Sequence, residues 1–158
     1  MTKLRPTLRD PEVLARAKSE LTDLLRSCEC MGGAGDDDFR KALDIIATDY
    51  DRDGYRLARR LEETLYCIPC FADAEALEGA HFILEKHRAI AEREWVKNEN
   101  LVIPHKVGDE ITFGWGEKRL TGVVKTLHPE RAELSVEVKG ESGMPIARLE
   151  NIKGQINV

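Results

Sequence analysis

Four cysteines stand in two close pairs whose spacing could support chemistry. Cys28 and Cys30 form a C-x-C pair, and Cys67 and Cys70 form a C-x-x-C pair after the intervening residues 31–66. Two such thiolate pairs can bind Zn²⁺ tetrahedrally, so a Cys₄ zinc site that joins two helix ends is one interpretation. C-x-C is less usual than C-x-x-C in structural zinc sites. The sequence therefore favours thiols that pack as small apolar groups, with no cofactor, and zinc stays open as the alternative.

A redox function for the C-x-x-C pair is a further reading of the same residues. The segment between Cys67 and Cys70 contains a proline, as in thioredoxin-like motifs. Such motifs follow a strand in a βαβ unit, where the thiol pKa is lowered. Here the pair follows a predicted helix, which argues against a redox site.

An acidic run over residues 49–54 resembles the opening of an EF-hand calcium loop. It places carboxylates at Asp49, Asp51 and Asp53 and a glycine at position 54. A calcium loop must close with a bidentate carboxylate at its twelfth position, which is Arg60 in this chain. We therefore expect a polar turn between helices, in which Asp53 caps the following helix.

No other arrangement of residue types indicates catalysis. The sequence contains no G-x-S-x-G, Walker A or G-x-G-x-x-G motif. His81 and His87 are spaced six apart on a predicted helix, whereas paired helical ligands are three or four residues apart. The sequence therefore predicts a protein that is not an enzyme.

The charge balance argues against a strong nucleic-acid binder. Lys and Arg total 24 and Asp and Glu total 29, a formal net charge of −5. Residues 101–158 carry equal numbers of basic and acidic side chains, so neither part has the dense basic stripe that phosphate binding favours. No apolar run is long enough to cross a bilayer, and the first residues do not resemble a signal peptide. We expect a cytoplasmic protein without a membrane partner.

Apolar residues recur at helical spacing through residues 10–98. An Asp-Pro-Glu sequence at residues 10–12 is suited to begin a helix, since Asp caps and Pro fits the first turn. An acidic run at residues 36–38 and Asp53 predict two further starts, and a long fourth helix follows to Asn98. The sequence predicts an N-terminal helical bundle domain over residues 8–100.

The pattern changes after this region to β-branched residues with glycines. Pro104 and Gly108 interrupt a linker, and short alternating segments follow. Five short strands in so few residues fit a small barrel better than a sandwich. The fold class is therefore predicted as α+β, with a helical bundle followed by a small five-stranded β-barrel domain over residues 104–158.

Four segments of the barrel region carry a resemblance to a known fold family. They read VGDEI at 107–111, LTGVV at 120–124, AELSV at 132–136 and PIARLE at 145–150. This order resembles an SH3-like barrel of the KOW/Tudor type over about one third of the chain. Such barrels serve RNA, DNA, protein tails and ribosomes alike, so the resemblance implies a fold and not one function.

The helical part is similar to small proteins of bacterial prophages and plasmids. The segments that carry this resemblance are DGYRLA at residues 53–58 and the EW pair at 94–95 before the barrel. The resemblance implies a bacterial cytoplasmic protein of phage or plasmid origin.

Candidate binding residues lie around an F-G-W-G segment of the barrel. Trp115 stands between two glycines, where a strand end or hairpin tip would expose its ring beside Phe113. Lys118, Arg119 and Lys125 supply cations nearby for phosphate or an acidic peptide. Packing of Trp115 between the two domains is the competing interpretation.

These observations predict a non-enzymatic interaction module that binds a protein partner through its barrel. The alternative is a nucleic-acid-binding accessory protein that uses the same basic and aromatic residues. Steep salt dependence would distinguish phosphate binding from an apolar contact. The amphipathic long helix is also compatible with a homo-oligomer.

Overall fold

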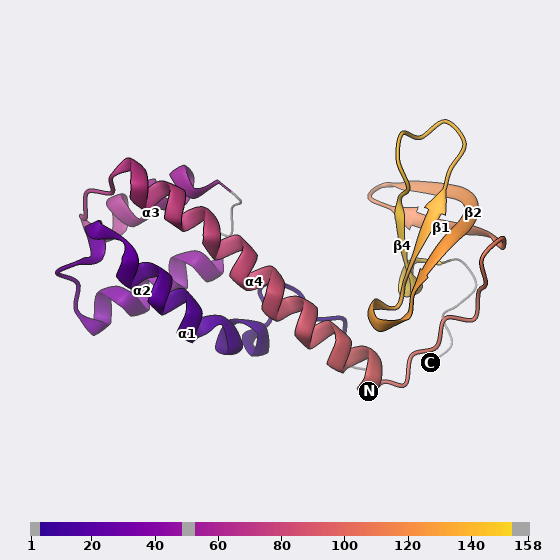
Figure 1. Ribbon diagram of the computed structural model, residues 1–158, viewed down its shortest axis with the longest axis horizontal. Helices are drawn as coiled ribbons and strands as arrows, with labels where there is room; N and C mark the ends of the chain where they lie inside the picture. The colour runs from indigo at the N-terminus through magenta and orange to yellow at the C-terminus, as the bar shows by residue number, and fades with distance from the viewer. Residues whose placement is uncertain (1–3, 49–52, 153–158) are drawn as a thin grey trace. The chain divides into compact units, whose positions relative to one another are not determined.

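A computed structural model describes residues 4–48 and 53–152 of the chain (Figure 1). Helices come first and an antiparallel sheet follows, so the fold is α+β with a helical N-terminal part. The chain divides into two compact units. One is Pro6–Ala91, and the other joins the start of the chain to residues from Glu92 onwards.

In the described residues of the helical part there are four α-helices: α1 (Pro11–Ser27), α2 (Asp36–Thr48), α3 (Gly54–Leu65) and α4 (Phe71–Asn98). The N-cap prediction for α1 is confirmed, because the side chain of Asp10 accepts a hydrogen bond from the backbone N–H of Glu12.

The predicted N-cap of α3 is also confirmed, because the carboxylate of Asp53 accepts a hydrogen bond from the backbone N–H of Tyr55. The remainder of the acidic run that resembles a calcium loop, residues 49–52, lies outside the described residues.

The core of the helical unit forms where the apolar faces of its helices meet. Leu21 and Leu25 from α1 pack with Ile46 from α2 and Leu61 from α3, and Leu77 of α4 joins them. Gly54 permits this approach, because a Cβ atom there would lie 2.0 Å from the backbone oxygen of Ala74. The start of α3 can therefore lie against α4 only without a side chain.

The sheet contains four strands in the described residues: β1 (Glu110–Trp115), β2 (Lys118–His128), β3 (Glu133–Glu137) and β4 (Ile146–Arg148). All neighbours are antiparallel and follow the order β1-β2-β3-β4. The sheet curls into a half-barrel, and an isolated bridge joins Phe113 of β1 to Ile152 beyond β4. Four strands are seen in this part of the chain where five were predicted, because the segment at Ile152 makes a single bridge.

Alternation along the strands separates an apolar face from a polar face. Phe113, Val124, Leu134 and Val136 are buried in the core of the sheet. Glu133 and Ser135 alternate with Leu134 and Val136 along β3, so they point to the opposite face. That polar face contains the site described below.

The division between the two compact units falls inside α4, at Ala91 and Glu92. Beyond it, Trp95 and Val96 pack with Ala132 in a small cluster of the C-terminal unit. No helix in the described ranges combines the length and apolar character of a membrane span.

Candidate functional site

A groove of about 620 Å³ lies beside the polar face of the sheet, within the C-terminal unit. We call it the sheet groove. Its walls come from the end of β1, the β1–β2 turn, the end of β2, the β2–β3 turn, β3, β4 and the short 3-10 turn after β4. The lining residues are Gly114, Trp115, Gly116, His128, Arg131, Glu133, Ser135, Ile146, Arg148 and Asn151.

Strand register brings these side chains together. Glu133 stands opposite Arg148, and Ser135 stands opposite Ile146, in the pairing of β3 with β4. Directly opposite residues of antiparallel strands point to the same face, so all four line one surface. His128 is opposite Glu133 on the other side of β3 and completes the wall.

The buried carboxylate of Glu133 sets the electrostatics of the groove. Only 4% of Glu133 is exposed. The Nε atom of Arg131 lies 3.3 Å from Glu133 Oε2, and that of Arg148 lies 3.5 Å from Glu133 Oε1. Both arginine side chains remain partly exposed, so they present positive charge to the groove as well as to Glu133.

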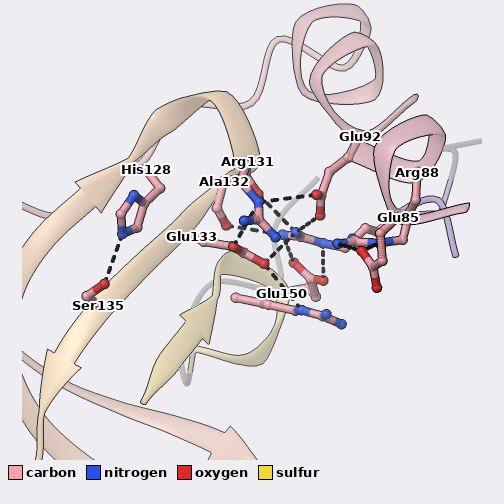
Figure 2. Close-up of polar contacts among 11 residues, drawn as sticks. Glu85, Arg88, Glu92, His128, Arg131, Ala132, Glu133, Ser135 and Glu150 are labelled. Atoms are coloured by element: carbon pink, nitrogen blue, oxygen red, sulfur yellow. Dashed lines mark hydrogen bonds and ion pairs between the residues drawn. The ribbon is translucent and has the colours of Figure 1, made fainter. Parts of the chain in front are cut away.

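A hydrogen bond between two neighbouring strands fixes the histidine of the groove. His128 Nε2 and Ser135 Oγ are 2.9 Å apart, as Figure 2 shows. The bond holds the imidazole against β3, and the ring thereby forms part of the groove wall.

Arg5 ties the start of the chain to this region. Its Nη1 atom donates to Glu92 Oε1 at 2.5 Å and to Glu133 Oε1 at 3.2 Å, and its Nη2 atom donates to Glu150 Oε2 at 3.0 Å. It also donates to the backbone oxygens of Arg131 at 2.9 Å and of the following residue at 3.1 Å. One guanidinium therefore binds the end of α4, the turn before β3 and the segment after β4.

Burial makes this guanidinium essential for charge balance. Glu92 has 0% exposure, and Figure 2 shows its carboxylate directed from α4 toward Arg131. Arg131 Nε lies 3.4 Å from Glu92 Oε2. The Arg5 guanidinium also lies 5.1 Å from the ring centroid of Trp95, a cation–π distance. Arg5, whose side chain is 8% exposed, is therefore a buried cation that both carboxylates share.

The chemistry available in the sheet groove is recognition of an anionic, partly apolar group. Arg131 and Arg148 can donate to a carboxylate or phosphate. Trp115, which is 44% exposed, and the exposed Ile146 supply apolar contact area beside them.

The structure brings together some of the binding residues that the sequence predicted. Trp115 lines the sheet groove, and Lys118 stands opposite it in the β1–β2 hairpin. Arg119 is exposed on the same hairpin. Phe113 lies in the sheet core, where its ring cannot reach a ligand, and Lys125 pairs with Glu137 on β3 at 2.7 Å.

The four cysteines lie near one another in the helical unit, around a carboxylate that sequence analysis missed. Asp73 Oδ1 accepts from the backbone N–H of Glu29 at 2.6 Å. Its Oδ2 accepts from the N–H of Cys30 at 3.3 Å and of Cys70 at 2.9 Å. Among the described residues, no three Cys, His, Asp or Glu side chains are grouped so as to hold a metal ion.

The ionisation of these groups follows from their surroundings. Burial raises the pKa of the Cys28 thiol to about 11, and the nearby Asp73 carboxylate acts in the same direction. Burial and the neighbouring Cys67 thiol also raise the pKa of Cys30. Burial opposes ionisation of Asp73, but the backbone N–H groups of Cys70, Glu29 and Cys30 outweigh it and hold the pKa of Asp73 below its ordinary value.

Several functional residues carried weak sequence signals. Glu92 falls on the apolar face of α4, three positions before Trp95, and a lone carboxylate on such a face indicates a buried ion pair. Arg5 had no signal, because its partners lie far along the chain.

Comparison with known protein families, with curated proteins and with solved structures found no match for this chain.

Replacing Arg5 by methionine is expected to destabilise the C-terminal unit by about 3–5 kcal/mol, because Glu92 and Glu133 lose a buried cation. Trp95 and Trp115 are the two tryptophans of the chain and both lie in this unit, so fluorescence during urea unfolding reports on it. Arg9→Met is the control, since Arg9 is exposed. A loss below about 1 kcal/mol for Arg5→Met would contradict the structural importance of the ion network.

Replacing Asp73 by asparagine is expected to destabilise the helical unit by about 2–4 kcal/mol near neutral pH, because an amide cannot accept three N–H bonds as a carboxylate does. The pKa of Asp73 is lowered in the folded state, so its stabilisation is present above the unfolded pKa and is lost as pH falls through the folded pKa.

The difference in unfolding free energy between the parent chain and Asp73→Asn should therefore shrink on acidification. Helical circular dichroism during urea unfolding at several pH values measures it. Glu75→Gln, an exposed change in the same helix, is the control. A difference that grows as pH falls would contradict this account of Asp73.

Proposed function

We propose that this chain is a non-enzymatic interaction module that binds an acidic, partly apolar segment of a protein partner in the sheet groove. The observation that carries the proposal is the position of Trp115 and Ile146 beside Arg131 and Arg148 on one concave surface. An apolar side chain of the partner would rest on Trp115, and a neighbouring carboxylate would bind the arginines.

The charge of the side chains that line the sheet groove favours a short acidic segment as the ligand over an extended polyanion. Of the ionised side chains that line the groove, Arg131 and Arg148 are positive and Glu133 is negative. This small positive excess suits one or two carboxylates. A long nucleic acid would need cations along its whole track, and residues 101–158 hold as many acidic as basic side chains.

The proposal includes an SH3-like barrel as the fold of the C-terminal unit. The half-barrel of four antiparallel strands supports it. The bridge between Phe113 and Ile152 stands where a fifth strand would close such a barrel. With the resemblance to prophage and plasmid proteins, we assign the module to the bacterial cytoplasm.

Single-stranded nucleic acid is the second candidate ligand. The β1–β2 hairpin favours it, since Lys118 stands opposite the exposed Trp115 and Arg119 is exposed next to it. Aromatic stacking beside cations is the usual arrangement for unpaired bases. On this hypothesis the hairpin, and not the arginines of the groove, holds the ligand.

The experiment is fluorescence anisotropy with a labelled short peptide that contains two glutamates beside a leucine. We expect binding, and about tenfold weaker binding after Trp115→Ala or Arg148→Gln, because each removes one contact at the groove. A matched peptide with glutamines in place of the glutamates should also bind about tenfold more weakly.

Two control variants separate the groove from the rest of the surface. Met144→Ala removes an exposed apolar side chain outside the groove, and Arg119→Gln removes a cation of the hairpin. Both should leave peptide binding unchanged. The nucleic-acid hypothesis would be favoured instead by two results together. The glutamate peptide would fail to bind, and a labelled oligouridylate would bind in a salt-sensitive way that Arg119→Gln abolishes.

A further inference from the structure

The strand β4 contributes backbone groups as well as side chains to the surface of the sheet groove. In the described part of the chain, β4 is the last strand of the sheet and pairs with β3 on one side. Ile146 and Arg148 of β4 line the groove, and Trp115 at the end of β1 lines it as well. An edge strand carries N–H and C=O groups that its own sheet does not use. Main-chain groups of β4 are therefore available where the ligand would lie.

Two hydrogen bonds show which residues of the β4 segment bond toward β3. The N–H of Val136 donates to the oxygen of Pro145 at 2.9 Å, and the N–H of Leu149 donates to the oxygen of Ala132 at 3.1 Å. Along an antiparallel pair, residues that are hydrogen-bonded to the neighbouring strand alternate with residues that are not. Every second residue of the segment 145–149, starting from Pro145, therefore bonds toward β3.

The residues between them have their backbone groups on the outer edge of β4. Ala147 bonds toward β3, so the N–H and C=O groups of Ile146 and the N–H group of Arg148 point away from β3. Pro145 belongs to the set that bonds toward β3, so its missing N–H does not block the outer edge. Three backbone groups of β4 thus lie where a further strand could pair.

The outer edge of β1 is less suited to pair with a partner. Phe113, in the middle of β1, already pairs with Ile152 there in an isolated bridge. Near the end of the same strand, a Cβ atom at Gly114 would lie 4.0 Å from the backbone oxygen of Asn151. The segment that follows β4 therefore lies along β1. In the described residues, the outer edge of β4 itself makes no such strand pairing.

The side chains on the β4 edge match the ligand of the sheet groove. Ile146 and Arg148 are two residues apart, so both point to the polar face of the sheet. An extended segment alongside β4 would have the same period of two residues. It could place an apolar side chain beside Ile146 and Trp115, and a carboxylate beside Arg148.

We propose that the acidic, partly apolar segment of the partner binds as an additional β-strand paired with the outer edge of β4. The inference rests on the proposed function, because it concerns how the same ligand lies in the sheet groove. The backbone of the segment exchanges hydrogen bonds with Ile146 and Arg148. Backbone pairing supplies affinity, and the contacts of alternate side chains with Trp115 and the arginines supply specificity.

The test uses the full chain and three forms of the glutamate peptide: unmodified, N-methylated at its odd-numbered residues, and N-methylated at its even-numbered residues. Successive N–H groups of a strand point to opposite edges, so one methylated form blocks the bonds to β4 and the other does not. Fluorescence anisotropy should show the blocked form binding at least about tenfold more weakly. The other form is the matched control and should bind like the unmodified peptide.

Hydrogen exchange of the ¹⁵N-labelled full chain measures the same pairing from the side of the protein. The unmodified peptide should slow exchange of the Ile146 and Arg148 amides at least about tenfold, because both amides donate to it. The amide of Ala147 is the internal control. It already bonds toward β3, so its exchange should slow much less.

The results separate this inference from the proposed function. If the unmodified peptide binds and both methylated forms bind equally well, or equally poorly, strand addition is wrong while the proposed function stands. If the unmodified peptide does not bind, the proposed function fails and strand addition fails with it. Protection of Ile146 and Arg148 that rises with protein concentration in the absence of peptide would show β4 edges pairing between two copies, and it would also overturn the proposal.

Discussion

Neutralising two buried carboxylates is the constraint on which the C-terminal unit depends. Glu92 comes from α4 and Glu133 from β3, and neither can be solvated where it lies. Arg5 binds both and also donates to backbone oxygens in the turn before β3. Three distant segments of the chain therefore meet in this unit, because the Arg5 guanidinium pairs with both buried carboxylates where they come together.

The same electrostatic arrangement shapes the sheet groove. With Arg5 on one side of Glu133, Arg131 and Arg148 can bind that carboxylate and still expose part of their side chains. If the proposed peptide binds here, these ion pairs hold the arginines in place beforehand, which lowers the entropic cost of binding. Trp115 extends from the end of β1 beside them. The groove therefore combines one polar and one apolar wall.

Local signals in the sequence predicted the helices well. Caps such as Asp10 and Asp53 depend on neighbours a few residues away, and the structure places both as expected. The strands of the sheet were harder to predict, because the contact of Ile152 with β1 is a single bridge to a residue far away in the sequence. In the groove, Trp115 was accessible to sequence reasoning. Arg5 was not, since its partners Glu92, Glu133 and Glu150 are all remote in the chain.

Nuclear magnetic resonance of the ¹⁵N-labelled full chain, titrated with the glutamate peptide, tests most directly whether the sheet groove binds the peptide. If it does, the Trp115 indole N–H and the backbone amides of Arg148 and Asn151 shift together and saturably, while amides of α1 to α3 stay in place. Shifts confined to Lys118 and Arg119 in the hairpin, or shifts in the helices alone, would contradict it.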